Sequence, residues 1–600
     1  MSITMKGASA LLAVALAAVL AACNRQPLAT PDAPVSQDAE FQALAERYVD
    51  ESTRFSPIDG TRQGDHRHDR EIDDLSPAGR EAQQAWDQAL LAALEKIDRL
   101  HISRANQVDA AMLANSLRAD LWNLAEFKRW SWDPLLYNDL AGSAIYNLMA
   151  REYAPLADRL KAASARLGKL RALYSVARAN LDVAKVPSVY AEQARDRNRG
   201  VLSLIDQFIR PNIDVLEGAD REALQTAILS AVRAVNEQQR WLEKGLVPKA
   251  RGDFRVGAAL FDKELAFALL SPLDRTEIRK RALLELRRTR EEMYEVARRV
   301  LAGRLKAPPL PDDPGPEVEQ NAIAAALDIA AAERPPRDQL VEFAKDELAR
   351  ASAFVRSKGL VSVPNDPIEI VLMPEFQRGF SVAYCDPPGP LDVGQKTFFA
   401  ISPIPREWDQ KKVDSFLREY NTRAISDLTF HEAMPGHYLQ LAYSNRYPSK
   451  LRSLLGSGSF IEGWGVYAER LMTDAGYRDN DPLMKLVNRK WYLRGIANAL
   501  IDQSIHVDGM TREQAMHLMT HDTFQEEREA AGKWVRAEIS STQLSTYFVG
   551  FQEHWDLRQE AELRWGARFN VKDYHDRLIS YGSPPVRFVR ALLFDLPIEP

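Results

Sequence analysis

Long stretches of the chain carry apolar residues at the spacing of an α-helix, with charged residues between them. The clearest of these stretches cover residues 82–100, 156–184, 221–242 and 275–301. Apolar side chains three and four residues apart share one face of a helix, and that face must be buried against another element. With 600 residues, 46% of them hydrophobic and 27% charged, the chain is long enough to bury a large core. The pattern predicts a mainly α-helical protein.

Two proline-rich segments, 306–316 and 334–337, interrupt the helical pattern, because proline lacks an N–H and its ring collides with the preceding turn. Residues 367–405 have a different pattern, with short runs of β-branched and aromatic residues separated by proline and glycine. These runs predict a small β-sheet. Such a sheet either holds an extended peptide along one edge or is purely structural.

The N-terminus has the features of a lipoprotein signal peptide. Lys6 precedes an apolar stretch from Ala8 to Ala22, which is shorter than the about 20 residues needed to span a bilayer. The stretch ends in Leu-Ala-Ala-Cys, which resembles the bacterial lipobox and would leave Cys23 carrying the lipid. We therefore expect a signal peptide at 1–22, a tether at 23–37 and one large helical domain at 38–600. An ordinary secretory signal cleaved nearby is the alternative.

These features predict a protein of the bacterial cell envelope, anchored to a membrane by lipid and facing the periplasm. Asn24 does not resemble the inner-membrane retention signal, which favours the outer membrane. If Cys23 is lipidated, Cys385 has no partner for an intramolecular disulfide. The net charge of −6 is modest, and no run of basic residues interleaved with aromatics indicates a nucleic-acid partner. The oligomeric state cannot be derived from the sequence.

Residues 431–437, His-Glu-Ala-Met-Pro-Gly-His, bring two imidazoles and a carboxylate into one short run. Zinc binds neutral imidazole nitrogen and carboxylate oxygen, and a catalytic site keeps one position for water. His431 and His437 are six residues apart, which in a regular helix separates them by about 120° and about 9 Å. Pro435 and Gly436 predict a kink or bulge that returns His437 to the face of His431. The alternative is two unrelated histidines in a helix-breaking turn.

Glu462 is the predicted third zinc ligand. The chain between it and His431 is long enough for one helix to end, turn through the glycine-rich segment 455–459 and return as a second helix. Glu469, seven residues further along, lies two turns away on the same helical face. It therefore competes for the ligand role or supports a ligand from behind. Glu432 is the predicted general base, which takes a proton from water and passes it to the leaving amine.

Residues 431–440 match the HExxPGHxxQ motif of a bacterial family catalogued as domain of unknown function 885, whose members are predicted zinc metallopeptidases. The chain resembles this family over nearly its whole mature length. Further matching blocks lie at 56–64, 386–388, 462–464, 494–506, 511–515, 543–550 and 581–585. Cys385 departs from the pattern, which has an aromatic residue before Asp-Pro-Pro. More distantly, the family is similar to thimet oligopeptidase and angiotensin-converting enzyme. This resemblance implies a two-lobed helical fold with a deep cleft and a glutamate as third ligand.

Several further site residues rest on the resemblance. His506 and Tyr547 lie downstream of the ligands, as do the residues that stabilise the oxyanion in the related peptidases; a buried structural role is the alternative. Asp502, four residues before His506, is expected to orient that imidazole. Arg494 is expected to pair with a substrate carboxylate or to form a structural salt bridge. Gln440, which ends the motif, is expected to support the site or contact substrate.

The sequence therefore favours a zinc-dependent peptidase that acts on peptide substrates. Two alternatives stay open. One is an envelope-anchored binding or scaffold protein whose site no longer turns over, and the other is a hydrolase of a non-peptide amide, for example in cell-wall material.

Overall fold

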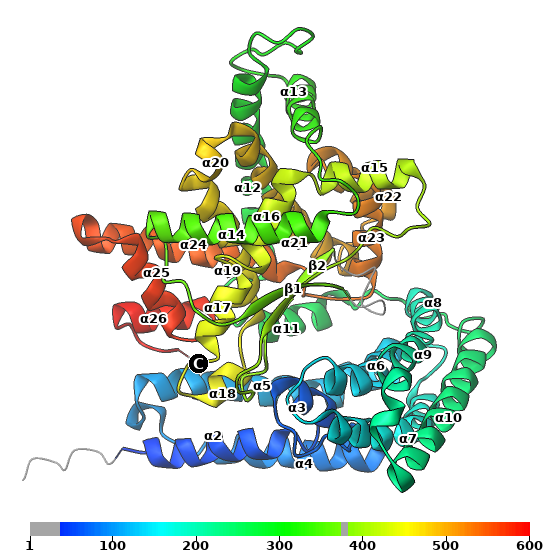
Figure 1. Ribbon diagram of the computed structural model, residues 1–600. Coiled ribbons are helices and arrows are strands. Elements are labelled where there is room, and N and C mark those ends of the chain that lie inside the picture. The colour runs from blue at the N-terminus through cyan, green and yellow to red at the C-terminus, as the bar shows by residue number, and fades with distance from the viewer. Residues whose placement is uncertain (1–35, 374–381, 600) are drawn as a thin grey trace, which may run out of the picture.

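The computed structural model describes residues 36–373 and 382–599, which are mainly helical with one small sheet (Figure 1). The predicted mainly α class is confirmed. The expected signal peptide, Cys23 and most of the tether lie outside the described residues. Within these ranges, none of the helices combines the length and apolar character needed to cross a bilayer.

The four predicted helices are present with similar bounds. They are α4 (Pro77–Leu94), α7 (Leu156–Asn180), α10 (Gly218–Trp241) and α12 (Arg275–Leu301). The first ends earlier than predicted, and the short helix η1 (Arg99–His101) follows it. The two proline-rich segments precede α13 (Pro316–Ala330) and α14 (Leu340–Lys358), so both separate helices as expected.

The N-terminal helices form two cores of their own along one side of the molecule (Figure 1). The smaller core is built around Leu90, Leu113 and Leu117. It is formed by α2 (Asp38–Ser52), α4 and α5 (Arg104–Trp122). The second core includes Leu160 and Leu167. Its helices are α6 (Pro134–Met149), α7, α8 (Ser188–Arg197), α9 (Gly200–Leu204) and α10.

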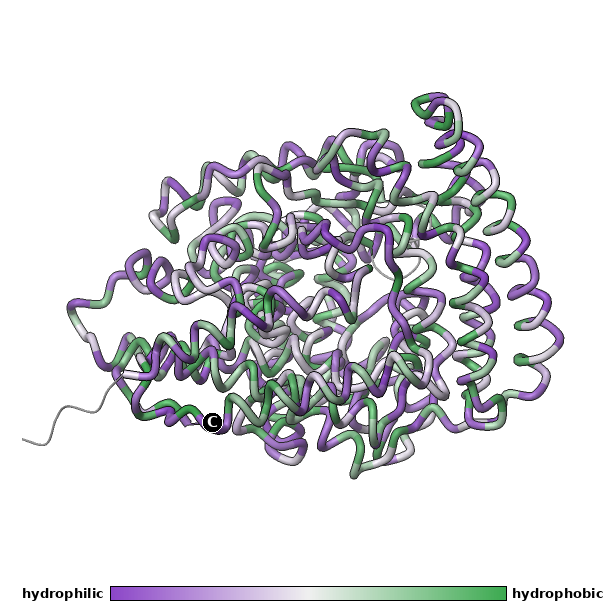
Figure 2. Tube along the Cα trace, turned by 90° about the horizontal axis from the view of Figure 1, so that it is seen from below, coloured by the Kyte–Doolittle hydropathy of each residue, from purple (hydrophilic) through white to green (hydrophobic). Residues whose placement is uncertain are grey.

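The largest core joins α12, α13 and α14 to the sheet and to the C-terminal helices. Its central helices are α16 (Thr422–Glu432), α17 (His437–Ser444), α19 (Gly458–Asp474), α21 (Pro482–His506) and α24 (Ser545–Trp565). Around them lie α11 (Gly257–Leu269), α15 (Gln410–Glu419), α20 (Tyr477–Asn480), α22 (Arg512–His517), α23 (Glu527–Glu538), α25 (Val571–Ser580) and α26 (Val586–Phe594). Figure 2 shows hydrophilic and hydrophobic residues alternating along the outer helices, as expected of helices that bury one face.

The predicted sheet has three strands in the order β1-β3-β2, with bounds β1 (Ile368–Leu372), β2 (Ala383–Asp386) and β3 (Thr397–Ile401). Strand β1 is parallel to β3 and β2 is antiparallel to it, with Ile370 and Cys385 both opposite Phe399. Strand β2 is therefore an edge strand, and it lies against α16 (Figure 1).

Two polar contacts tie the N-terminal helices to the rest of the chain. Just after α3 (Pro57–Gln63), His66 lies 3.2 Å from Asp69 and 3.5 Å from Asp392, which follows β2. Arg452 of α18 (Lys450–Leu454) forms an ion pair with Asp109 of α5. The side chains of Arg452 and Asp109 are only 0% and 3% exposed. If one of the two were removed, water could not solvate the charge of the other.

Candidate metal centre

The helix that carries the two motif histidines is interrupted between them. Helix α16 ends at Glu432 and α17 begins at His437. The chain turns so tightly that a Cβ at Gly436 would lie 1.9 Å from the carbonyl oxygen of His431, which leaves room only for glycine. The predicted distortion is confirmed, as a break between two helices. It brings the rings of His431 and His437 to a centroid distance of 4.5 Å, nearly perpendicular to each other.

Helix α19 returns along this pair and places Glu462 between the two imidazoles. The Oε2 atom of Glu462 lies 3.5 Å from Nε2 of both His431 and His437. These distances are long for hydrogen bonds. They are close to the about 3.3 Å that separates two ligands of a tetrahedral zinc ion with bonds of about 2.0–2.1 Å.

The polar atoms of this group also fit a small cation. One ligand atom from each of the three residues lies within 4.8 Å of the other two. Glu462 Oε2 is buried and has no hydrogen-bond partner among the described residues. Burial raises the pKa of Glu462, but the two imidazoles lower it by more, to well below its ordinary range. Glu462 is therefore a carboxylate, which is the form that binds metal.

Glu469 lies behind His431, away from Glu462. Its Oε1 atom is 2.6 Å from His431 Nδ1, the ring nitrogen that does not face Glu462. Histidines that bind metal usually donate their other N–H to a carboxylate or carbonyl, which fixes the orientation of the ring. Of the two roles considered for Glu469, the geometry favours support of His431. Gly465 makes this packing possible, because a Cβ there would lie 2.6 Å from the His431 ring.

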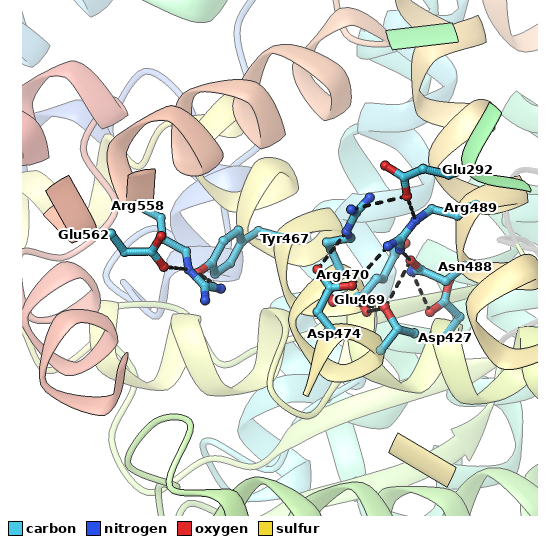
Figure 3. A network of polar contacts seen from close by, with 11 residues as sticks. Glu292, Asp427, Tyr467, Glu469, Arg470, Asp474, Asn488, Arg489, Arg558 and Glu562 are labelled. Carbon is cyan, nitrogen blue, oxygen red and sulfur yellow. Dashed lines mark hydrogen bonds and ion pairs between the residues drawn. The ribbon is translucent and has the colours of Figure 1, made fainter. Parts of the chain in front are cut away.

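A buried polar network continues behind Glu469 (Figure 3). Asp427 accepts hydrogen bonds of 3.1 and 3.3 Å from the side-chain amide of Asn488. Arg489 donates to Asn488 and pairs with Asp474 at 3.0 Å. Burial and the nearby charge of Glu469 raise the pKa of Asp427 well above its ordinary value. Thr473 joins this network to the backbone of Glu469, because its hydroxyl lies 3.3 Å from the Glu469 carbonyl oxygen and 3.2 Å from Asn488 Oδ1.

Glu432, the predicted base, is held by the edge of the sheet. Its Oε2 atom accepts a hydrogen bond of 2.9 Å from the backbone N–H of Cys385 in β2. Because this contact uses the backbone, the departure from an aromatic residue at position 385 does not remove it. The N–H of Cys385 points away from β3, and in a strand the residue two positions earlier has the same orientation. Ala383 therefore also directs its backbone polar groups outward.

A cavity of about 650 Å³ adjoins this group. His431, Glu432 and Glu469 line the cavity, whereas His437 and Glu462 do not, so it reaches the group from the side of His431. The other walls come from the sheet and from α8, α15, α21, α23 and α24. The described structure does not establish the expected two-lobed form with a deep cleft, which stays a prediction.

Tyr547 lies on the cavity wall, with its ring centroid 6.4 Å from that of His431. Its hydroxyl accepts a hydrogen bond of 3.1 Å from Arg536 of α23. The sequence analysis missed Arg536 and its neighbour Lys533, both of which line the cavity. Charged residues three or four positions apart are usual on a solvated helix face, so their spacing gave no signal of a site.

His506 and Asp502 are not part of this site. His506 Nε2 lies 2.9 Å from the carbonyl oxygens of both Ala537 and Ser540. Among the residues that the structure describes, Asp502 accepts three hydrogen bonds, from the backbone of Thr542 and from the backbone and hydroxyl of Ser545, and none from His506. The expectation that His506 stabilises an oxyanion and that Asp502 orients it is therefore corrected. Both residues position the segment that leads into α24.

Gln440 and Arg494 also have structural partners. The Gln440 amide donates to the hydroxyl of Ser583 at 2.6 Å, and Gln440 does not line the cavity, which corrects the expectation of a substrate contact. Arg494 lines the cavity and pairs with Glu529 at 2.5 Å, the salt bridge considered as its alternative role. Its Nη1 atom is buried without a hydrogen-bond partner in the described structure and lies 3.9 Å from Glu419.

A second group of possible ligands lies on the surface, where α22 continues into the turn η8 (Leu518–Asp522). His521 and His517 lie 2.8 and 3.9 Å from the carboxylate of Asp522. The side chain of His517 is 65% exposed and that of His521 is 51% exposed. Any measurement of bound metal must therefore separate this surface group from the buried one.

Comparison with known proteins identifies the family. The sequence model of the family described as bacterial protein of unknown function (DUF885) matches residues 57–593. A solved structure from Shewanella oneidensis, described as a candidate lipoprotein of unknown function, is 31% identical with a TM-score of 0.79; the match covers 92% of this chain and 99% of that one. A candidate lipoprotein from Colwellia psychrerythraea, 17% identical with a TM-score of 0.74 over 92% and 98% of the two chains, has the same fold. No curated protein matches significantly. The family resemblance derived from the motif is thus confirmed, and the chain belongs to this bacterial family of unknown function.

Proposed function

We propose that this protein is a zinc-dependent peptidase, with His431, His437 and Glu462 as the metal ligands. The observation that carries the proposal is the position of Glu462 Oε2, buried and equidistant from two imidazole nitrogens at 3.5 Å. Carboxylate and imidazole are the donors that zinc takes in hydrolytic sites. A bound zinc ion would act as a Lewis acid that polarises the scissile carbonyl and acidifies water.

Glu432 and Tyr547 would supply the proton transfer and the stabilisation of the developing negative charge. Glu432, held by the N–H of Cys385, would take a proton from the attacking water and give it to the leaving amine. The phenol of Tyr547 would donate a hydrogen bond to the negative charge that develops on the carbonyl oxygen. Arg536 donates to the Tyr547 oxygen, which leaves the phenol proton free to point toward the substrate.

The edge strand β2 supports a peptide as substrate. Ala383 lines the cavity, and its backbone N–H and C=O are directed outward beside Glu432. An extended peptide can add to such an edge through main-chain hydrogen bonds, which are independent of the substrate sequence. This arrangement favours peptide hydrolysis over hydrolysis of a non-peptide amide.

We further propose that the protein works in the bacterial cell envelope. Both similar structures are described as candidate lipoproteins, and residues 1–23 have the pattern of a lipoprotein signal. Lipid on Cys23 would attach the folded part to a membrane on its periplasmic side, with the outer membrane favoured. Labelling cells with a radioactive fatty acid tests this directly, because replacing Cys23 with Ser would abolish incorporation.

The decisive test of the peptidase proposal combines metal content with turnover. Zinc is measured by mass spectrometry in a chain with both surface histidines replaced, H517A/H521A, so that only the buried group contributes. We expect one zinc ion per chain, and its loss in His437→Ala and Glu462→Gln. Activity is measured on a mixed peptide library, with products identified by mass and a chelator control.

The variant Glu432→Gln separates chemistry from metal binding. It should keep one zinc ion and lose at least about 100-fold in kcat, the contribution expected of a general base. Loss of zinc together with activity would show that Glu432 holds the metal or the fold instead. A wild-type chain that binds zinc at no more than trace level would refute the proposal and favour a binding or scaffold role.

A further inference from the structure

One wall of the cavity carries basic side chains that form no ion pair with its carboxylates in the described structure, although both kinds of residue line it. Lys533 of α23 lines the cavity and is only 6% exposed. Among the described residues its ammonium forms neither a hydrogen bond nor an ion pair. A buried charge without a partner is costly unless a ligand supplies that partner.

Two arginines surround Lys533. Arg536, one helical turn further along α23, donates only to neutral groups within the described residues, the side chain of Gln543 at 2.8 Å and the hydroxyl of Tyr547 at 3.1 Å. Arg494 pairs with Glu529, and its second terminal nitrogen, which has no hydrogen bond among the described residues, lies 3.9 Å from Glu419. Burial and the charges of Arg494 and Arg536 lower the pKa of Lys533 well below its ordinary value. The three cations thus share an environment that an anion would complete.

The acidic residues of the same walls are already engaged. Glu529 binds Arg494 and accepts a hydrogen bond from Tyr420 at 3.1 Å. Glu419 pairs with Lys490 at 2.7 Å. Glu526 pairs with Arg418 at 3.0 Å. None of them forms an ion pair with Lys533 or Arg536 in the described part of the chain, so an anion in the cavity would pair with Arg536 and favour the protonated form of Lys533.

We propose that Lys533, together with Arg494 and Arg536, binds the C-terminal carboxylate of the peptide substrate. This inference rests on the proposed peptidase function and specifies its substrate class. Charged ammonium and guanidinium groups form the strongest hydrogen bonds with carboxylates. The free end of a peptide brings such a carboxylate wherever the cavity admits only a short segment of chain.

The position of the cationic group also sets how much of the peptide is released. Arg536 contacts Tyr547 beside His431, and Lys533 lies three residues earlier on the same helix. The Cβ atoms of residues three positions apart on a helix are about 5–6 Å apart. An extended chain advances about 3.3–3.6 Å per residue. A carboxylate on Lys533 therefore leaves space for one or two residues between the scissile carbonyl and the C-terminus, and the enzyme acts as a carboxypeptidase or dipeptidyl carboxypeptidase.

The test compares two forms of one peptide that differ only in the C-terminal group. An N-acetylated pentapeptide of neutral residues is supplied as the free acid and as the C-terminal amide to the zinc-loaded full chain. We expect the acid to be cleaved with at least tenfold higher kcat/KM, with release of one or two C-terminal residues. Equal cleavage of both peptides, or products cut only from the N-terminal side or the middle, would overturn the proposal.

Variants of Lys533 link this preference to the residue. Lys533→Met keeps the length of the side chain, removes an unpaired buried charge and should fold with an unchanged or higher melting temperature. It should reduce the acid-to-amide ratio to near one through a rise in KM for the acid, and Lys533→Arg should restore most of the ratio. Lys485→Met, in α21 and away from the cavity, is the matched control and should leave the ratio unchanged.

A binding measurement keeps this proposal distinguishable from the peptidase proposal. In Glu432→Gln, titration calorimetry compares the affinity of the acid and amide peptides, without need for turnover. The wild type could cleave no peptide and still bind the acid at least tenfold more tightly than the amide, with Lys533→Met removing that difference. This result would support the carboxylate site and refute the peptidase function. If the acid and amide bind equally, or inorganic phosphate binds at Lys533 while the peptides do not discriminate, the carboxylate site is refuted.

Discussion

Replacing Gly465 with alanine is the sharpest test of how α19 builds the site. The new Cβ would lie 2.6 Å from Cε1 and 2.8 Å from Nδ1 of the His431 ring. Carbon atoms in contact are normally about 3.5–4.0 Å apart, so the ring or the helix must move by about 1 Å. The ring cannot turn aside freely, because it is buried and its Nδ1 is bonded to Glu469 at 2.6 Å.

Two effects of this displacement can be measured separately. Overpacking of a buried site costs about 1–3 kcal/mol, so the free energy of unfolding without metal should fall by that amount. A misplaced ligand should also weaken zinc binding by about 10- to 100-fold, or about 1.4–2.7 kcal/mol. Urea unfolding in chelator reports the first effect, and competition with a chromogenic chelator reports the second.

Gly168 provides the matched control for the substitution. It lies within α7, and a Cβ there would have nothing within 4 Å. Gly168→Ala should leave zinc affinity unchanged and stabilise the helix by up to about 1 kcal/mol. If Gly465→Ala, like this control, lowered neither the free energy of unfolding nor the zinc affinity, the inferred close packing of α19 on His431 would be refuted.

Three further predictions concern other buried or partly buried polar contacts. Glu469→Gln should lower zinc affinity about 10- to 100-fold in the same chelator competition, because the amide cannot accept the His431 proton as a carboxylate does; unchanged affinity would remove Glu469 from its supporting role. His66 has its pKa lowered by burial but raised by more, to about 9, by the two carboxylates beside it, so its stabilisation is complete below about pH 6.5 and lost as the pH rises through 9. His66→Gln should therefore cost roughly 1–2 kcal/mol at pH 6, after allowance for solvent screening, and almost nothing at pH 10, as measured by urea unfolding; an equal cost at both values would contradict this. Arg452→Met leaves Asp109 buried without its partner and should destabilise by about 3–5 kcal/mol, whereas Arg47→Met in an exposed pair should cost less than about 1 kcal/mol.

Much of the helical framework follows from local sequence. Helix α12 has the predicted bounds, because its apolar stripe begins after Asp274, whose side chain caps the backbone N–H of Glu277 at 2.8 Å. The three candidate ligands were also found from sequence, because two of them share a motif and the third lies on the next long helix. In both cases the signal is carried by residues close together in the chain.

The other parts of the site depend on packing between distant elements. The spacing of Asp502 and His506 predicts a shared helical face, but it does not reveal that Phe254 and Phe261 lie against the His506 ring at centroid distances of 6.0 Å. Lys533 looks like a solvated lysine until α23 packs beside α21 and encloses it. Short-range periodicity says which side of a helix is polar, but not whether water or a cavity lies beside that side.

The crossing of α19 and α24 makes the candidate metal ligands sensitive to residues that do not contact them. A Cβ at Gly463 would lie 2.2 Å from the backbone of Gly550, so the two helices touch main chain to main chain. The same helix carries Glu462 on one side of this crossing and Glu469 two turns further on. A larger side chain at Gly550 would therefore push α19 away from α24. Glu462 and Glu469 would be displaced together, although neither residue contacts position 550.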